Sequence, residues 1–260
     1  MNLSDVMLSV AKTLGGVVQS TATAGSTLYL TDSTLGANAE QYNGGTLFIT
    51  SGSNSGAIRT VSTFIENKFT WTDAFTTPIS AGVTYAAVNE TFPRFVLSQG
   101  INEVLQNTYI TLIDETLVTV AEQEDYTLPT GVNDVRRVEI ATNDTAPYTY
   151  KPSHYWEEMN GTLRFYTNAP GDDAKKIRLF YAGCHGALAE TGTVNAAIDR
   201  DWLIWAAVAW IYRNLIQNIH KDNPTANELL NEAKNMEANA ANMARKHCLR
   251  VMAKDPVFFA

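Results

Sequence analysis

The sequence predicts an α+β fold with a C-terminal antiparallel helical hairpin, a central β region and a small antiparallel β-barrel or sandwich. Two observations predict it. Apolar residues recur with helical spacing near both ends of the chain, and short strand-like runs separated by turn residues occupy most of the sequence between them. With 260 residues, 45% of them hydrophobic, the chain is long enough to form one large or two small domains with a buried core.

The first fourteen residues are predicted to form a helix. Ser4 or Asp5 can cap its start, and Gly15-Gly16 ends it. The apolar residues that recur three or four positions apart are Leu3, Val6, Met7, Val10 and Leu14.

Residues 20–90 are rich in Thr, Ser and Gly, and turn signals such as Asn43-Gly44-Gly45 divide them into short runs. This spacing indicates a small antiparallel barrel or sandwich. Strands are expected at 27–31, 45–50, 57–64, 68–72 and 83–88.

A second helix is expected from about Phe92-Pro93, because proline is tolerated in a first helical turn. Its apolar stripe comprises Leu97, Ile101, Val104, Leu105 and Tyr109. Strand character then returns, with strands expected at 111–120, 125–128, 135–141, 161–166 and 176–181.

Two helices are expected to end the fold. Asp199 or Asp201 caps the first, which runs to about His220. The second starts at Pro224, or one or two residues later if Thr225 and Glu228 form a capping box, and runs to about Cys248. The short break between them favours an antiparallel hairpin.

The first of these two helices is apolar nearly all round. Such a helix is either buried on most sides or has one side in contact with another subunit. The second reading gives a subunit interface on the hairpin, formed by Trp202, Trp205, Trp210, Leu229, Met236 and Met243.

The overall charge limits the classes of partner. The chain has 19 basic and 27 acidic side chains, a net charge of −8, which argues against a protein that reads nucleic-acid sequence through a basic face. The longest apolar run, residues 202–212, is about half of the ~20 residues that a membrane-spanning helix needs, and the first residues do not resemble a secretory signal. We therefore expect no membrane partner.

Sequence motifs for chemistry are missing. The chain contains no GxxxxGKS/T, no GxGxxG between a strand and a helix, and no GxSxG. Cys184-His185 and His247-Cys248 offer zinc-ligand types, but adjacent strand residues point to opposite faces, which argues against a metal site. We expect no catalytic residue, metal or cofactor, and therefore no enzyme. A weaker alternative is a glycan hydrolase that uses Glu157 or Glu158 with a second carboxylate.

Residues 249–260 are expected to form a docking tail. Asp255-Pro256 disfavours a helix there, and the apolar Val257-Phe258-Phe259 that follows needs a cover, for which a groove on a partner is suited. Together with the basic residues upstream, this tail would be a positively charged segment on an otherwise acidic protein. The candidate docking residues are Arg250, Val251, Lys254, Pro256, Val257, Phe258 and Phe259.

Residues 125–138, with the sequence DYTLPTGVNDVRRV, resemble a stretch of the head-to-tail adaptor proteins of tailed bacteriophages. Trp156, the following NGTLRF at 160–165 and the IRLFY at 177–181 are similar to the sequel of that stretch. The closing helical hairpin also resembles the core that the family shares. The likeness covers roughly residues 90–250.

The resemblance implies a division of the chain into four parts. Residues 1–17 would be the N-terminal helix of a helical core, residues 18–91 an inserted small β-barrel domain, residues 92–248 the adaptor core and residues 249–260 a tail that docks on the portal protein.

The resemblance also implies a function. Such proteins form homo-oligomeric rings, typically of twelve copies, under the portal at the neck of the virion, after assembly in the host cytoplasm. The ring extends the channel through which double-stranded DNA passes without sequence recognition, and it attaches tail or nozzle proteins. Two alternatives stay open. The chain could be a tail-completion, nozzle or tail-tube ring protein, or residues 18–91 could bind carbohydrate or a host surface through Trp71, Tyr85 and Tyr42.

Overall fold

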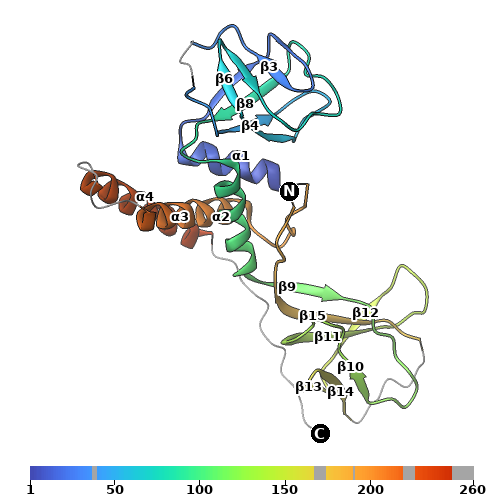
Figure 1. Ribbon diagram of the computed structural model, residues 1–260. Coiled ribbons are helices and arrows are strands. Elements are labelled where there is room, and N and C mark those ends of the chain that lie inside the picture. Colours follow the sequence, from blue (N-terminus) through green and yellow to red (C-terminus); the bar gives the residue numbers. More distant parts are fainter. Residues whose placement is uncertain (37–39, 167–173, 190, 219–225, 248–260) are drawn as a thin grey trace. The chain divides into compact units, whose positions relative to one another are not determined.

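The structure is a computed structural model that describes residues 1–36, 40–166, 174–189, 191–218 and 226–247. Within these ranges lie four helices and fifteen strands, and the strands form four antiparallel sheets (Figure 1). The described residues divide into two compact units. Unit 1 contains those of 1–105 and 186–248, and unit 2 contains those of 106–185.

The prediction of an α+β fold with a helical core is wrong. In the described part of the chain the fifteen strands far outnumber the four helices, and the strands form no closed barrel. The helical periodicity near the chain ends is real, but the segment between them contains more strands than the sequence pattern revealed. Many of these strands have only two to four residues, too few for a clear alternation of apolar and polar positions.

The helix α1, Leu3–Leu14, confirms the first helical prediction, because all five of its predicted apolar residues are buried. It ends at Gly15 and Gly16, whose φ angles of 91° and 73° favour glycine. The predicted cap is wrong: Asn2 precedes the helix, and Ser4 is buried inside its first turn.

Residues 18–88 form two four-stranded sheets, which we call the β module. One sheet has the strand order β1-β8-β4-β5 and the other β2-β3-β7-β6. Apolar residues from both sheets, among them Leu47, Phe64 and Phe69, form one buried cluster. The strands are β1 Val18–Thr21, β2 Ala24–Gly25, β3 Tyr29–Thr31, β4 Thr46–Ile49, β5 Ile58–Thr60, β6 Thr63–Ile65, β7 Lys68–Thr70 and β8 Thr84–Val88.

The differences from the sequence prediction in the β module are local. The strands β1 and β2 were not predicted, and the expected strand at 57–64 is two strands, β5 and β6. These two strands belong to different sheets, so the chain changes sheet at Val61 and Ser62.

The other helices of unit 1 are α2 Arg94–Gln106, α3 Arg200–Asn218 and α4 Ala226–Lys246. The central helix is α3, which packs against both α1 and α4. It also lies close to α2, because a Cβ atom built on Gly100 would be 2.8 Å from Cγ1 of Ile211. Asp199 caps α3 as predicted, since its Oδ1 accepts a hydrogen bond of 2.7 Å from the backbone N–H of Trp202. The predicted break at 221–224 lies outside the described residues.

Unit 2 contains a four-stranded sheet, with the order β12-β11-β15-β9, and a three-stranded sheet, with the order β10-β14-β13. Their shared core includes Trp156, Leu163 and Leu179. The strands are β9 Tyr109–Asp114, β10 Asp125–Thr127, β11 Val135–Ala141, β12 Tyr150–Ser153, β13 Trp156–Met159, β14 Thr162–Phe165 and β15 Ile177–Cys184.

Two strands of unit 2 carry no clear sequence signal. Pro152 lies in β12, which is an edge strand and therefore tolerates a residue without an N–H group. Glu157 and Glu158 make β13 look like a solvated loop in the sequence. Tyr109, expected on the stripe of the second helix, instead begins β9 and is exposed.

We expect Gly100→Val to destabilise unit 1 by about 1–3 kcal/mol, because the new side chain would overlap with Ile211 and Trp210 on α3. Urea unfolding followed by tryptophan fluorescence measures this change. The matched control is Gly36→Val, where the space around a Cβ atom is open, and a change within about 0.5 kcal/mol is expected. Equal stabilities of the two variants would contradict the close packing of α2 on α3.

Candidate functional site

The seven candidate docking residues lie outside the described residues. They are Arg250, Val251, Lys254, Pro256, Val257, Phe258 and Phe259. Their role therefore depends on the sequence alone.

The candidate subunit interface lies on the α3–α4 pair. Trp202, Trp205 and Trp210 are half-buried on α3. On α4, Met236 is exposed to 37% and Met243 is half-buried. Leu229 also lies within α4. The tryptophans thus contribute to the packing of unit 1 and still leave part of their surface open.

The helices α3 and α4 run antiparallel. Near one end, His247 Nδ1 lies 3.6 Å from Asp199 Oδ1, and farther along the pair Arg213 Nη2 donates a hydrogen bond of 2.9 Å to Glu237 Oε1. Among the α4 residues whose burial the structure describes, the buried ones are Ala233, Ala240 and Ala244. Small side chains let two helices approach closely, so α4 is covered along one narrow seam.

A second face of α4 is left largely uncovered. At about 100° per residue, Glu228, Glu232, Met236, Asn239 and Met243 fall within an arc of about 80°, centred about 100° from the alanine seam. We call these five residues the α4 stripe. Four of them are exposed, and Met243 is half-buried. The stripe is acidic in its first half and neutral in its second.

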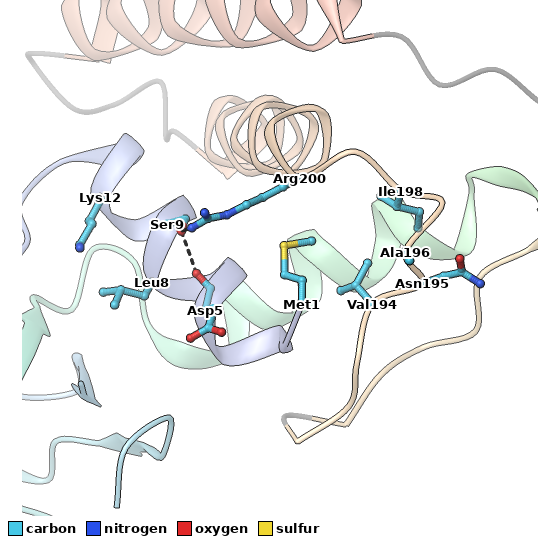
Figure 2. Close-up of a pocket in the computed structure, with 10 residues that line it drawn as sticks. All are labelled: Met1, Asp5, Leu8, Ser9, Lys12, Val194, Asn195, Ala196, Ile198 and Arg200. Atoms are coloured by element: carbon cyan, nitrogen blue, oxygen red, sulfur yellow. Dashed lines mark hydrogen bonds between the residues drawn. The ribbon is translucent and has the colours of Figure 1, made fainter. Parts of the chain in front are cut away.

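A groove of about 480 Å³ lies between α1 and the segment that leads into α3 (Figure 2). We call it the α1 groove. One wall carries Asp5, Leu8, Ser9 and Lys12, which lie three or four residues apart on the outer face of α1. The other side is lined by Met1 and by five residues at and just before the start of α3, which are Val194, Asn195, Ala196, Ile198 and Arg200.

Two cations border the α1 groove. Lys12 is exposed, and the guanidinium group of Arg200 donates a hydrogen bond of 2.9 Å to the hydroxyl of Ser9 (Figure 2). The Ser9 hydroxyl in turn donates to the backbone carbonyl of Asp5, at 2.8 Å. Arg200 is thus held over the groove by a neutral partner, which leaves its charge available to an anion.

The residues considered for chemistry have structural roles or lie apart. Both carboxylate oxygens of Glu158 accept backbone hydrogen bonds, from Asp134 N at 3.1 Å and from Val135 N at 2.7 Å. The hydroxyl of Tyr166 donates to Glu157, which raises the pKa of that tyrosine. Among the described residues no three His, Cys, Asp or Glu side chains come together as a metal site would require, and Cys248 lies beyond them.

The three aromatic residues proposed to stack on sugars are core residues of the β module. Tyr42, Trp71 and Tyr85 are exposed to only 5%, 4% and 1%. The indole N–H of Trp71 donates to Thr27 O at 2.9 Å, and the Tyr85 hydroxyl donates to Asp32 Oδ2 at 2.8 Å. These side chains fill the space between the two sheets and cannot form a binding platform on the surface.

Asp32 is the central polar group of the β module and is fully buried. Besides Tyr85, the backbone N–H and hydroxyl of Thr34 donate to its Oδ1, at 2.9 and 2.6 Å. Burial favours the neutral acid, but these hydrogen bonds and one from Ser20 outweigh it, so the pKa of Asp32 is lower than usual. Burial and the nearby Asp32 carboxylate raise the pKa of Tyr85.

No protein-family model matches the chain, and no curated protein matches its sequence. In the part of the chain that the structure describes, no helix combines the length and the hydropathy needed to cross a membrane.

We expect the β module to lose stability as the pH falls below about 4. The Asp32 pKa is lower in the folded state than in the unfolded state, so its contribution is complete above the unfolded value and is lost as the pH falls through the folded one. Hydrogen exchange at the amides of β8, measured between pH 3 and 6, reports this loss. Asp32→Asn should flatten the dependence, and an unchanged slope would contradict it.

The Tyr85→Phe variant should be less stable than the wild type by about 1–3 kcal/mol at pH 7, because it leaves the buried carboxylate with one donor fewer. Tyr29→Phe is the matched control, since Tyr29 is half-buried on the outside of β3. Thermal unfolding of the two variants side by side makes the comparison.

Proposed function

We propose that this chain is a structural protein of a tailed-bacteriophage virion, a head-to-tail adaptor that forms a ring under the portal. In this role it extends the DNA channel at the neck and attaches the tail. It needs no cofactor and catalyses no reaction. The proposal starts from the resemblance of residues 125–138, 160–165 and 177–181 to that family.

The observation that carries the proposal is the one-sided coverage of α4. The alanine seam holds α4 on α3, while Met236 is left exposed on its flank and the tryptophans of α3 are only half-buried. An exposed apolar side chain on a helix flank is better covered in an assembly than in water. A subunit that repeats around a ring supplies such a cover from its neighbour.

The charge of the chain supports the same role. A net charge of −8 per copy is multiplied in a ring, and a channel with the same sign as the phosphate backbone does not retain DNA by counterion release. DNA can then pass in either direction without being held.

The experiment that tests this function uses the phage whose genome encodes the chain. Particles made without the protein should be DNA-filled heads without tails, and adding the purified protein to extracts of such heads and free tails should restore joined particles. Antibody labelling in electron micrographs should place the protein at the neck. Tailed, infectious particles made without it would contradict the proposal.

The tail prediction is tested by Phe258→Ser combined with Phe259→Ser. Loss of the two aromatic side chains should leave the fold and thermal unfolding of the protein unchanged and reduce its binding to portal-bearing heads at least tenfold, because buried aromatic anchors dominate such contacts. Co-sedimentation with heads measures the binding. Wild-type binding by this variant would show that residues 249–260 are not the docking segment.

A further inference from the structure

We propose that the α4 stripe of one copy binds in the α1 groove of the next copy, and that this contact links the copies of the ring. The inference depends on the proposed function for the existence of the ring and adds which two surfaces meet. Both surfaces belong to unit 1, and each is described above from its own residues.

The charges of the two surfaces are complementary. The acidic half of the stripe carries Glu228 and Glu232, both exposed. The groove carries Lys12, which is exposed, and Arg200, whose guanidinium group donates a hydrogen bond to the neutral hydroxyl of Ser9. Glutamates brought to these cations form charge-assisted hydrogen bonds, which are stronger than neutral ones.

The order of residues along the two helices also matches. In the stripe, Glu232 and Asn239 are seven residues apart, and in the groove Lys12 and Asp5 are seven residues apart, which is about 10 Å on each helix. With Glu232 at Lys12, the amide of Asn239 reaches Asp5, the one acidic group of the groove. In this placement the two helices are antiparallel, Glu232 is the glutamate that meets the groove cations, and Glu228 lies about 6 Å beyond Lys12.

The apolar residues fall between these polar contacts. Met236 lies midway along the stripe, and Leu8 lies midway along the wall of the groove between Asp5 and Lys12. Val194 and Ile198 line the groove behind it. An unbranched methionine adapts its shape to such a surface, so it suits an open groove of this kind.

The acidic half of the stripe cannot reach the groove of its own chain. Arg200 is the first residue of α3, and Arg213, which pairs with Glu237, lies about 20 Å farther along that helix. Because α4 runs antiparallel to α3, Glu232 lies about another 8 Å beyond that level. The glutamates of the stripe are therefore roughly 27 Å or more from Arg200 along the helix pair, too far to pair with the groove cations of their own chain, so this contact forms between copies.

A contact between two different surfaces of the same chain is heterologous. Each copy offers one stripe and one groove, so every copy binds two neighbours, and the chain of copies closes when the rotation per contact divides a full turn. A two-fold dimer would use both stripe–groove contacts between the same two copies, so the mass of the assembled species distinguishes a ring from a pair.

The experiment reverses the charge of each surface separately in the full chain. The groove variant carries Lys12→Glu and Arg200→Glu, and the stripe variant carries Glu228→Lys and Glu232→Lys. All four side chains are exposed, so both variants should fold, which circular dichroism and thermal unfolding check. Light scattering after size-exclusion chromatography gives the mass of each species.

Each variant alone should associate at least a hundredfold more weakly than the wild type, because like charges then meet at every contact. An equimolar mixture of the two should assemble again, since the basic stripe of one meets the acidic groove of the other and the two unchanged surfaces also match. The matched control is Lys234→Glu, an exposed charge reversal on another side of α4, which should assemble like the wild type.

The outcomes separate this inference from the proposed function. If the wild type assembles and both variants assemble equally well, the proposed ring is retained and the stripe–groove contact is wrong. If each variant fails alone and the mixture fails too, the two surfaces do not bind each other. If the wild type remains monomeric both alone and with portal-bearing heads, both proposals are wrong.

Discussion

The burial of α3 is the constraint on which unit 1 depends. A helix that is apolar on nearly all sides cannot be covered by one neighbour, and here α1, α2 and α4 share the task. Gly100 lets α2 approach closely, and the alanines of α4 do the same on another side. Because α4 binds through a narrow seam of small side chains, most of its circumference is left open, and the surface available to neighbours follows directly from the way α3 is buried.

The sheets depend on α3 much less, because each pair of sheets has its own core. The β module packs aromatic rings such as Phe64 and Phe69 between its sheets, with centroids 4.5 Å apart, and unit 2 packs Trp156 with Leu163 and Leu179. Asp32 is a buried carboxylate in the largely apolar interior of the β module, and its hydrogen bonds from Tyr85 and Thr34 compensate for its burial. Separate cores explain why so much of the chain is β.

The sequence predicts the helices with strong apolar periodicity correctly. It does not predict how many strands accompany them. The five apolar residues of α1 and the cap at Asp199 could be read directly, because helical spacing and capping are local properties. The strands β1, β12 and β13 could not, because polar residues fill them and pairing with distant strands, which no local window contains, stabilises them.

The candidate site shows the same division. The helical spacing was enough to place Met236 and Met243 on one side of their helix. Trp71 and Tyr85, in contrast, were expected on the surface and are buried, because the sequence of a Thr-rich segment does not show whether its aromatic residue points inward or outward. The α1 groove could not be found from the sequence at all, because it joins α1 to residues almost two hundred positions later, and only the folded chain brings Ser9 to Arg200.

The central claim is that this protein works as a repeated subunit. The most direct test is the mass of the assembled species, measured by native mass spectrometry on the purified wild-type protein with and without the isolated portal ring. We predict one closed assembly with a fixed number of copies bound to each portal, about twelve by the family resemblance. A single copy per portal, or no binding in either sample, would contradict the account.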